Sequence, residues 1–138
     1  MNIEAFLLCD AATDTQGKLN VLGAFDHIFS PQTPTIYPSC TVAARIRFTK
    51  VEEGKHKVRL NIIDSDGKSV VPPLDGAIEV RIPDNTDSTV ANLILNLQNV
   101  KLNKFGEYRI DLAIDGRQEG SLPFNLREVK QAPPPAPK

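Results

Sequence analysis

The chain has 138 residues, of which 41% are hydrophobic, and its 16 basic and 17 acidic side chains give a net charge of −1. This is enough chain for one domain with its own core. The near-zero net charge argues against nucleic acid or an anionic membrane surface as a partner, since both attract an excess of basic residues. No stretch is long and apolar enough to predict a membrane-spanning helix.

The start of the chain and its cysteines suggest a compartment. Glu4 and Asp10 interrupt and close the first apolar run, and no basic segment precedes it. We therefore expect no signal peptide and a cytoplasmic location. Cys9 and Cys40 are then expected to be reduced, and two distant cysteines make neither a disulfide framework nor a metal knuckle.

A cysteine, three aspartates and a histidine crowd into AFLLCDAATDTQGKLNVLGAFDHI, residues 5–28. We predict strands over residues 2–9 and 19–29, connected by residues 10–18. Because consecutive strands run in opposite directions, Asp10 and Asp14 are expected at one end of the domain and Asp26 and His27 at the other. Cys9 is then expected to be a small buried side chain. It cannot contact His27, so the two cannot form a nucleophile and its general base, which must be within hydrogen-bond distance.

Two features of these first strands carry further expectations. Residues 5–8 are apolar at both odd and even positions, so both faces of the first strand carry apolar side chains. Both faces should therefore be covered, by a partner, a second copy or a loop of the same chain. Gly23, in mid-strand, predicts a bulge that re-aims Asp26 and His27.

The rest of the chain alternates between apolar and polar residues with a period of two, which is typical of half-buried strands. Apolar spacings of three and four, the mark of an amphipathic helix, do not persist anywhere. The predicted strands cover residues 40–48, 57–62, 78–82, 91–97, 108–114 and 122–126.

Turn residues stand between these strands. Asp66-Gly67 and Asp115-Gly116 predict tight hairpins, and Pro72-Pro73 and residues 83–89 interrupt the pattern. We predict an all-β fold, an immunoglobulin-like antiparallel β-sandwich of about eight strands with almost no helix, over residues 1–129. The prolines of residues 130–138 predict a disordered tail, whose P-x-x-P sequence also fits the ligands of proline-binding domains.

Tyr108 opens a predicted strand just after Gly106 and Leu102. This resembles a tyrosine corner, in which the phenol bonds to backbone a few residues upstream. The alternative is a tyrosine that only packs at the start of a strand. Its role is structural in either case.

Acidic residues are frequent in the predicted loops. If strand directions alternate throughout, residues 10–18, 51–54, 83–89 and 115–117 gather at one end of the domain. Converging oxygens can build a calcium site, whereas aspartates in turns commonly cap backbone amides without an ion. The candidate metal ligands are Asp10, Asp14, Asp84, Asp87 and Asp115, with Glu52 and Glu53 nearby.

Asp64-x-Asp66-Gly67 matches only the opening of a calcium loop and is expected to be a hairpin. His56 lies between two lysines and is expected to be exposed. With two histidines and two cysteines placed apart, a zinc site is not expected.

Four blocks of sequence resemble an uncharacterised family of short bacterial proteins. The match spans about residues 3–127 and has one departure, Ala24-Phe25 where relatives carry a glycine pair and a tryptophan. The resemblance implies a β-sandwich and assigns no activity. The blocks are Leu7 to Ala12, Gly17-Lys18-Leu19 to Asp26, Asp64 to Gly67, and Gly106 to Ile110 with Asp115-Gly116.

The sequence therefore favours a non-catalytic binding module, whose partner is a protein or a second copy of the chain, with no cofactor. The alternative is a sandwich that binds calcium or a small ligand through its acidic loops. An enzyme is not expected, because no phosphate loop, nucleophile elbow or metal-histidine motif is present in the sequence.

Overall fold

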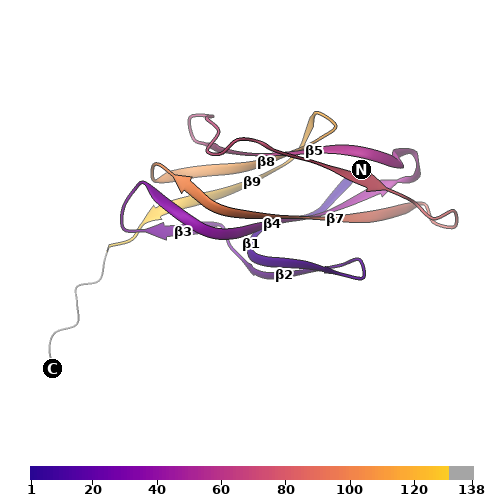
Figure 1. The fold of residues 1–138 in the computed structure, drawn as a ribbon, viewed down its shortest axis with the longest axis horizontal. Coiled ribbons are helices and arrows are strands. Elements are labelled where there is room, and N and C mark those ends of the chain that lie inside the picture. Colours follow the sequence, from indigo (N-terminus) through magenta and orange to yellow (C-terminus); the bar gives the residue numbers. More distant parts are fainter. Residues whose placement is uncertain (131–138) are drawn as a thin grey trace, which may run out of the picture.

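The computed structural model of the chain describes residues 1–130. Two sheets face each other, one of four strands and one of five (Figure 1). The strands are β1 (Asn2–Thr15), β2 (Lys18–Ala24), β3 (His27–Ser30), β4 (Thr35–Thr49), β5 (Gly54–Asp64), β6 (Leu74–Val80), β7 (Ser88–Leu102), β8 (Gly106–Ile114) and β9 (Arg117–Glu128).

The one helical element of residues 1–130 is a short 3-10 turn, η1 (Lys50–Glu52). None of the helical structure in this part of the chain is long and apolar enough to cross a membrane. The proline-rich tail predicted over residues 130–138 lies, from residue 131 on, outside the described residues.

The core lies between the two sheets and consists of the side chains that the period of two places on one face of each strand. In β4 the predicted inward set, Cys40, Val42, Ala44, Ile46 and Phe48, is buried. The same holds for the predicted inward residues of β5 and β8, which are Val58, Leu60, Ile62, Tyr108, Ile110, Leu112 and Ile114. The largest fully buried side chains are Phe48, Ile46, Leu60, Ile62, Leu102, Ile110, Leu112 and Leu126.

The strand order is β2-β1-β4-β7 in one sheet and β3-β9-β8-β5-β6 in the other. The first sheet is antiparallel, as predicted. The second is mixed, because β3 runs parallel to β9. The prediction of a wholly antiparallel sandwich was therefore wrong for this one strand pair.

The strand predicted over residues 19–29 is in fact two strands, which raises the count to nine. The break falls at Phe25-Asp26, and the chain there passes from the first sheet to the edge of the second. The Phe25 amide donates to the Leu8 carbonyl, and the Asp26 carbonyl accepts from the Asn125 amide, both at 2.9 Å. Phe25 is thus bonded to the first sheet and Asp26 to the second. The chain therefore crosses between the sheets without a separate loop.

Residues 10–15 were predicted to be part of a loop, but in the structure they continue β1. They pair with β2 down to a two-residue turn in which Gln16 and Gly17 both have positive φ. At Cys9 the chain changes partner, since this residue faces Thr41 of β4 on one side and Ala24 of β2 on the other.

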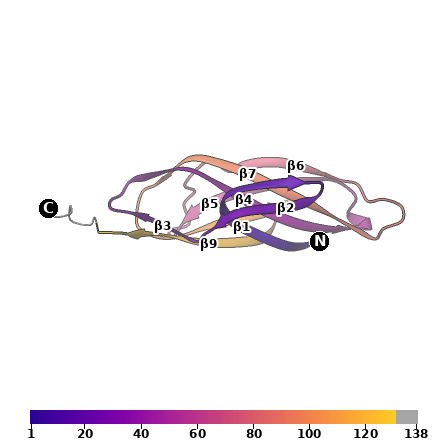
Figure 2. The same cartoon turned by 90° about the horizontal axis from the view of Figure 1, so that it is seen from below.

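The β1–β2 hairpin folds back over the outer face of its own sheet. In Figure 1 it lies beyond the β4–β7 layer, and from below, in Figure 2, it crosses in front of these strands. Thr41 and Ala43, which the alternation places on the outer face of β4, are consequently buried. Ala5 and Leu7, on the outer face of β1, are half-buried beside Leu19 and Val21 of the hairpin, so the chain itself supplies part of the cover predicted for the first strand.

Gly23 has a positive φ of 67°, yet the pairing register is the same on both sides of it, so no residue is inserted there. A Cβ at this position would lie 2.5 Å from the Asp10 carboxylate. The glycine therefore allows close approach of the two strands and is not a bulge. An inserted residue lies instead at Glu4, where the pairing with β4 shifts register.

The two predicted tight turns are present. Asp115 and Gly116 both have positive φ and join β8 to β9 directly, and the Gly67 amide donates to the Asp64 carbonyl. Tyr108 forms the tyrosine corner: its hydroxyl donates to the Lys104 carbonyl at 2.5 Å, where the chain crosses from β7 to β8 in the other sheet.

We expect Tyr108→Phe to lower the free energy of unfolding by about 1–2 kcal/mol, because a backbone carbonyl at the crossing loses its donor. Tyr37→Phe removes the only other tyrosine hydroxyl of the chain and serves as the matched control, with a smaller expected effect. Urea unfolding of both variants measures the difference. Equal losses in the two variants would contradict a stabilising corner.

Candidate interaction surface

The edge of β7 is a long unpaired stretch of backbone in the described chain. β7 is the last strand of its sheet and pairs with β4 along its whole length, from Leu102 opposite Thr35 to Ser88 opposite Thr49. Its other edge carries no recorded backbone hydrogen bond to another segment of residues 1–130. An edge of this kind presents alternate N–H and C=O groups to a further strand.

The side chains along this edge carry no charge. From Ser88 to Val100 the sequence is STVANLILNLQNV, and the nearest charged residues are Asp87 and Lys101. Over this run β7 therefore lacks the lysines or glutamates that commonly protect an edge from further pairing.

The inner face of β7 is incompletely covered. Leu93 and Leu95 are only half-buried, whereas Val42 and Ile46 on the neighbouring β4 have no exposed surface. An edge strand has a neighbour on one side only, and β6 of the opposite sheet does not close the gap fully. Apolar surface is thus available beside the unpaired backbone.

The other sheet edges are shorter or protected. β6 carries Asp75 and Glu79, and Arg59 Nε donates to Asp75 at 2.7 Å. β2 has seven residues, among them Lys18 and the positive-φ Gly23. β3 has only four residues.

The part of β9 beyond β3 lies against β1. A Cβ at Gly120 would come within 3.1–3.3 Å of the Phe6 and Ile3 side chains. This half of β9 therefore packs its inner face on β1, and its free edge carries Glu119 and Pro123, residues that oppose strand addition.

A polar clamp borders the β7 edge on the outer face of the sheet. Arg45 of β4 donates from Nη1 to the Gly17 carbonyl at 3.0 Å and to Asn92 Oδ1 at 3.2 Å. Asn92 of β7 donates in turn to Asp14 Oδ2 at 2.9 Å. The hydrogen bonds from Asn92 and from the Gly17 amide lower the pKa of Asp14. These contacts hold the tip of the β1–β2 hairpin against β4 and β7.

Glu4 completes the clamp from β1. The residue inserted there turns its carboxylate toward β4, where it accepts from Arg45 Nε at 3.1 Å and from Arg47 Nε at 2.7 Å. The Arg47 hydrogen bond is the main cause of its lowered pKa.

The five candidate metal-ligating aspartates are not brought together as one group. Asp10 lies beside Gly23, at the opposite end of the hairpin from Asp14, because residues 10–15 are a strand and not a loop. Asp84 and Asp87 lie in the connection from β6 to β7, and Asp115 in the β8–β9 turn. Within residues 1–130 no three His, Cys, Asp or Glu side chains are placed to hold a metal ion.

His56 was predicted to be exposed, and this was wrong. It is held in a hydrogen-bond network at the end of the sandwich. Its Nδ1 lies 2.6 Å from Asp115 Oδ2, its Nε2 lies 2.5 Å from the Glu52 carbonyl, and its ring stacks on Phe48. The side chain is only 14% exposed. Burial against β4 and the adjacent turns overrides what its charged sequence neighbours indicated.

The network continues to the N-terminus. The Glu52 carboxylate accepts from the Thr49 amide at 2.8 Å and pairs with the Met1 amino group at 2.9 Å, and the Thr49 bond is the main cause of its lowered pKa. Asp115 Oδ1 accepts from the Lys57 amide at 2.9 Å. The acidic residues that converge here therefore already serve as partners of His56, of backbone amides and of the terminal amine.

Both cysteine thiols are buried and free. Cys9 donates to the Thr41 carbonyl at 3.4 Å, and desolvation raises its pKa. Burial raises the pKa of Cys40 to about 11. Thiols in such surroundings are poor nucleophiles. His27, which starts β3, lies 2.6 Å from the Asp26 carboxylate.

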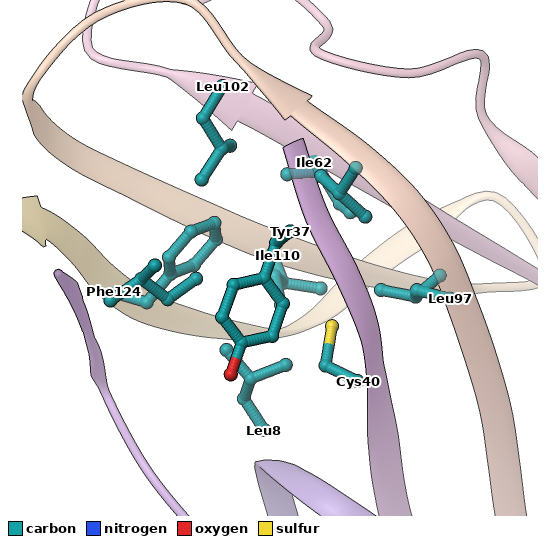
Figure 3. Close-up of a pocket in the computed structure, with 10 residues that line it drawn as sticks. Leu8, Tyr37, Cys40, Ile62, Leu97, Leu102, Ile110 and Phe124 are labelled. Carbon is teal, nitrogen blue, oxygen red and sulfur yellow. The ribbon is translucent and has the colours of Figure 1, made fainter. Parts of the chain in front are cut away.

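A small cavity lies between the sheets, next to Cys40. Figure 3 shows Leu8, Tyr37, Ile62, Leu97, Ile110 and Phe124 around it. Its volume is about 10 Å³, roughly the space of one water molecule, and its lining is apolar. A small-molecule ligand would need the sheets to separate.

The β7 edge was not predicted from the sequence. The strand over residues 91–97 and its inward side chains were predicted correctly. Its place at the edge depends on a pairing with residues far away in the chain. The absence of charge from Ser88 to Val100 was the available signal.

We expect His56→Gln to destabilise the protein more at pH 6 than at pH 8. The Asp115 hydrogen bond, aided by the Glu52 carbonyl, raises the pKa of His56 above its ordinary value of 6.5. A raised pKa adds stability that is present below 6.5 and is lost as the pH rises through the raised value. The difference in Tm between the two proteins should therefore narrow from pH 6 to pH 8.

Thermal unfolding at several pH values measures this difference, and His27→Gln controls for the loss of an imidazole at a more exposed position. If the difference in Tm between the wild type and His56→Gln stays constant or widens toward pH 8, the His56 contacts are not charge-assisted.

We expect millimolar calcium and excess chelator to leave the Tm unchanged, because the candidate aspartates are dispersed and the carboxylates of Asp14 and Asp115 already accept from backbone or side-chain donors. Differential scanning calorimetry with and without calcium tests this. A rise in Tm with calcium that chelator reverses would reveal a site among the acidic turns.

Two solved structures show similarity to the chain. Beta-glucosidase from Listeria innocua, in complex with isofagomine, has a TM-score of 0.51 and 10% identity, over 91% of this chain and 16% of that one. The Pseudomonas fluorescens alkylpurine DNA glycosylase AlkC, bound to DNA containing an abasic site analog, has a TM-score of 0.47 and 12% identity, over 88% and 30%. The chain thus spans less than a third of either protein, and at this identity the likeness concerns the fold alone.

No curated protein matches the chain in sequence. A family model does match, over residues 4–127, which is nearly the whole sandwich and agrees with the resemblance seen in the four sequence blocks. The chain is therefore a member of the family of unknown function DUF6941.

Proposed function

We propose that the protein is a non-catalytic interaction module, and that its binding surface is the free edge of β7. The edge takes an extended strand of a protein partner as an added strand of the four-stranded sheet. The observation that carries this proposal is the uncharged run from Ser88 to Val100 on an unpaired edge strand. Main-chain hydrogen bonds supply affinity in this mode of binding, and side chains on alternate positions supply specificity.

The contrast between the edges of the molecule supports β7 as the site. The opposite edge, β6, has an aspartate, a glutamate and an ion pair, which oppose further pairing. A strand added to β7 would also cover the half-buried Leu93 and Leu95. Pairing there satisfies backbone groups and removes apolar surface from water together.

A catalytic role has less support from the described residues. The titratable groups that lie close together already have hydrogen-bond partners. His56 bonds to the Asp115 carboxylate and to the Glu52 carbonyl, and Asp115 also accepts from the Lys57 amide. Both thiols have raised pKa values. The calcium or small-ligand alternative is favoured by no specific observation.

We also propose that the sandwich is immunoglobulin-like. In chain order and pairing, β1, β4 and β7 correspond to strands A, B and E of that fold, and β5, β8 and β9 to strands C, F and G. The tyrosine corner at the start of β8 supports this, because it falls where the corner of strand F is found in such domains.

A labelled peptide of residues 87–101 is a defined probe for the edge. We expect it to bind the full chain and to bind Gln98→Lys at least about tenfold more weakly, because a lysine on the edge opposes strand addition. Gln118→Lys makes the same change at an exposed position of β9 and should bind as the wild type does. Fluorescence anisotropy measures all three.

Equal binding to both lysine variants would place the peptide elsewhere than on β7. Absence of binding to the wild type would contradict strand addition at this edge.

A further inference from the structure

We infer that the strand which occupies the β7 edge is β7 of a second copy, paired antiparallel about a twofold axis at Ile94. This inference rests on the proposed function and names its partner. The result is a homodimer whose two four-stranded sheets join edge to edge. A self-complementary interface of this kind is the commonest form of protein oligomer.

The charges at the two ends of the strand favour this partner and this direction. Asp87 precedes Ile94 by seven residues, and Lys101 follows it by seven. An antiparallel pair centred on Ile94 therefore brings Asp87 of each copy to Lys101 of the other. A parallel pair would instead oppose aspartate to aspartate and lysine to lysine, which costs stability.

The side chains between these charges are self-compatible in the same register. Leu93 of one copy lies opposite Leu95 of the other on the inner face, and Asn92 lies opposite Asn96 on the outer face. Because opposed residues differ by an even number of positions, inner faces meet inner faces. The half-buried leucines of each edge are then covered by those of its counterpart.

Asn99 limits the regular part of the ladder. Its φ is +53°, and beyond it the buried positions shift from Leu97 to Val100 and Leu102. Lys101 thus reaches Asp87 from just outside the paired segment, which its long, exposed side chain permits. The self-pairing proper covers Val90–Gln98.

Charge reversal tests both the partner and the register. Sedimentation velocity over a concentration series should show a dimer of the wild type. Asp87→Lys and Lys101→Asp should each weaken the homodimer by about tenfold, because two attractive pairs become repulsive. Both residues are exposed, so neither change should impair folding.

The informative step is to mix the two weakened variants. In a mixed dimer, the lysines at positions 87 and 101 of the first variant each face an aspartate of the second. Dimers should therefore form again at the concentrations at which the wild type dimerises. This recovery should diminish as salt rises. Failure of the mixture to recover, with both single variants weakened, would overturn the register about Ile94.

A cysteine at the axis provides an independent measurement. Ile94→Cys should form a disulfide-linked dimer under mild oxidation, because a self-opposed pair has its Cβ atoms about 4.5–5.5 Å apart. Val51→Cys, at a position that is 95% exposed on η1, is the control and should crosslink far more slowly. Equal crosslinking of the two variants would contradict the axis.

The failures of the two proposals are distinguishable. If the wild type is monomeric at all concentrations but the peptide of residues 87–101 binds in a manner sensitive to Gln98→Lys, the edge takes a strand and this inference is wrong. If the wild type dimerises and neither charge reversal nor Gln98→Lys affects the dimer, the interface lies elsewhere and both proposals are wrong.

Discussion

The architecture depends on one constraint, which is that the first strand must be covered on both of its faces. Ala5, Phe6, Leu7 and Leu8 are apolar in succession, so the inner sheet packing can bury only every second one of them. The chain meets this constraint by changing partner at Cys9 and folding the next fifteen residues back over its own sheet. The buried outer-face Thr41 and Ala43 of β4 are the result.

That fold-back decides which edges of the sheet remain open. Its tip is fixed by Arg45 and Asn92, so the outer face of β4 is covered up to the first residues of β7. On the inner face, Phe6 and Ile3 of β1 pack against β9 at Gly120. With β6 protected by charge, the uncharged and unpaired backbone of β7 is the edge at which we propose association.

The period of two was sufficient to predict the all-β class and the inward faces of β4, β5 and β8, and the Asp-Gly pair predicted the turn at Asp115-Gly116. These features are local, because each depends on residues one or two positions apart. The hairpin was missed for the same reason. Residues 10–15, DAATDT, have no apolar alternation, since their strand is solvent-exposed, and they were taken for a connection.

The site was harder to predict than the fold. His56 was assigned to the surface from its lysine neighbours, although Phe48 and Asp115, which hold it, come from distant segments. Asp10 and Asp14 were expected to lie together in one loop because residues 10–15 were not counted as part of the first strand. The edge position of β7 likewise follows from pairing order, which a single sequence does not encode locally.

The pairing of β7 with β4 also has a consequence for synthesis of the chain. Its opposed residues are separated by 39 positions at one end, Thr49 with Ser88, and by 67 at the other, Thr35 with Leu102. At translation rates of about 5–20 residues per second, β4 leaves the ribosome several seconds before its neighbour exists. During that interval the nascent chain presents a second uncharged edge, on β4 from Cys40 to Ala44, to whatever lies nearby. The strand proposed to bind a partner in the mature protein is thus also the strand that ends the exposure of the β4 edge in the nascent chain.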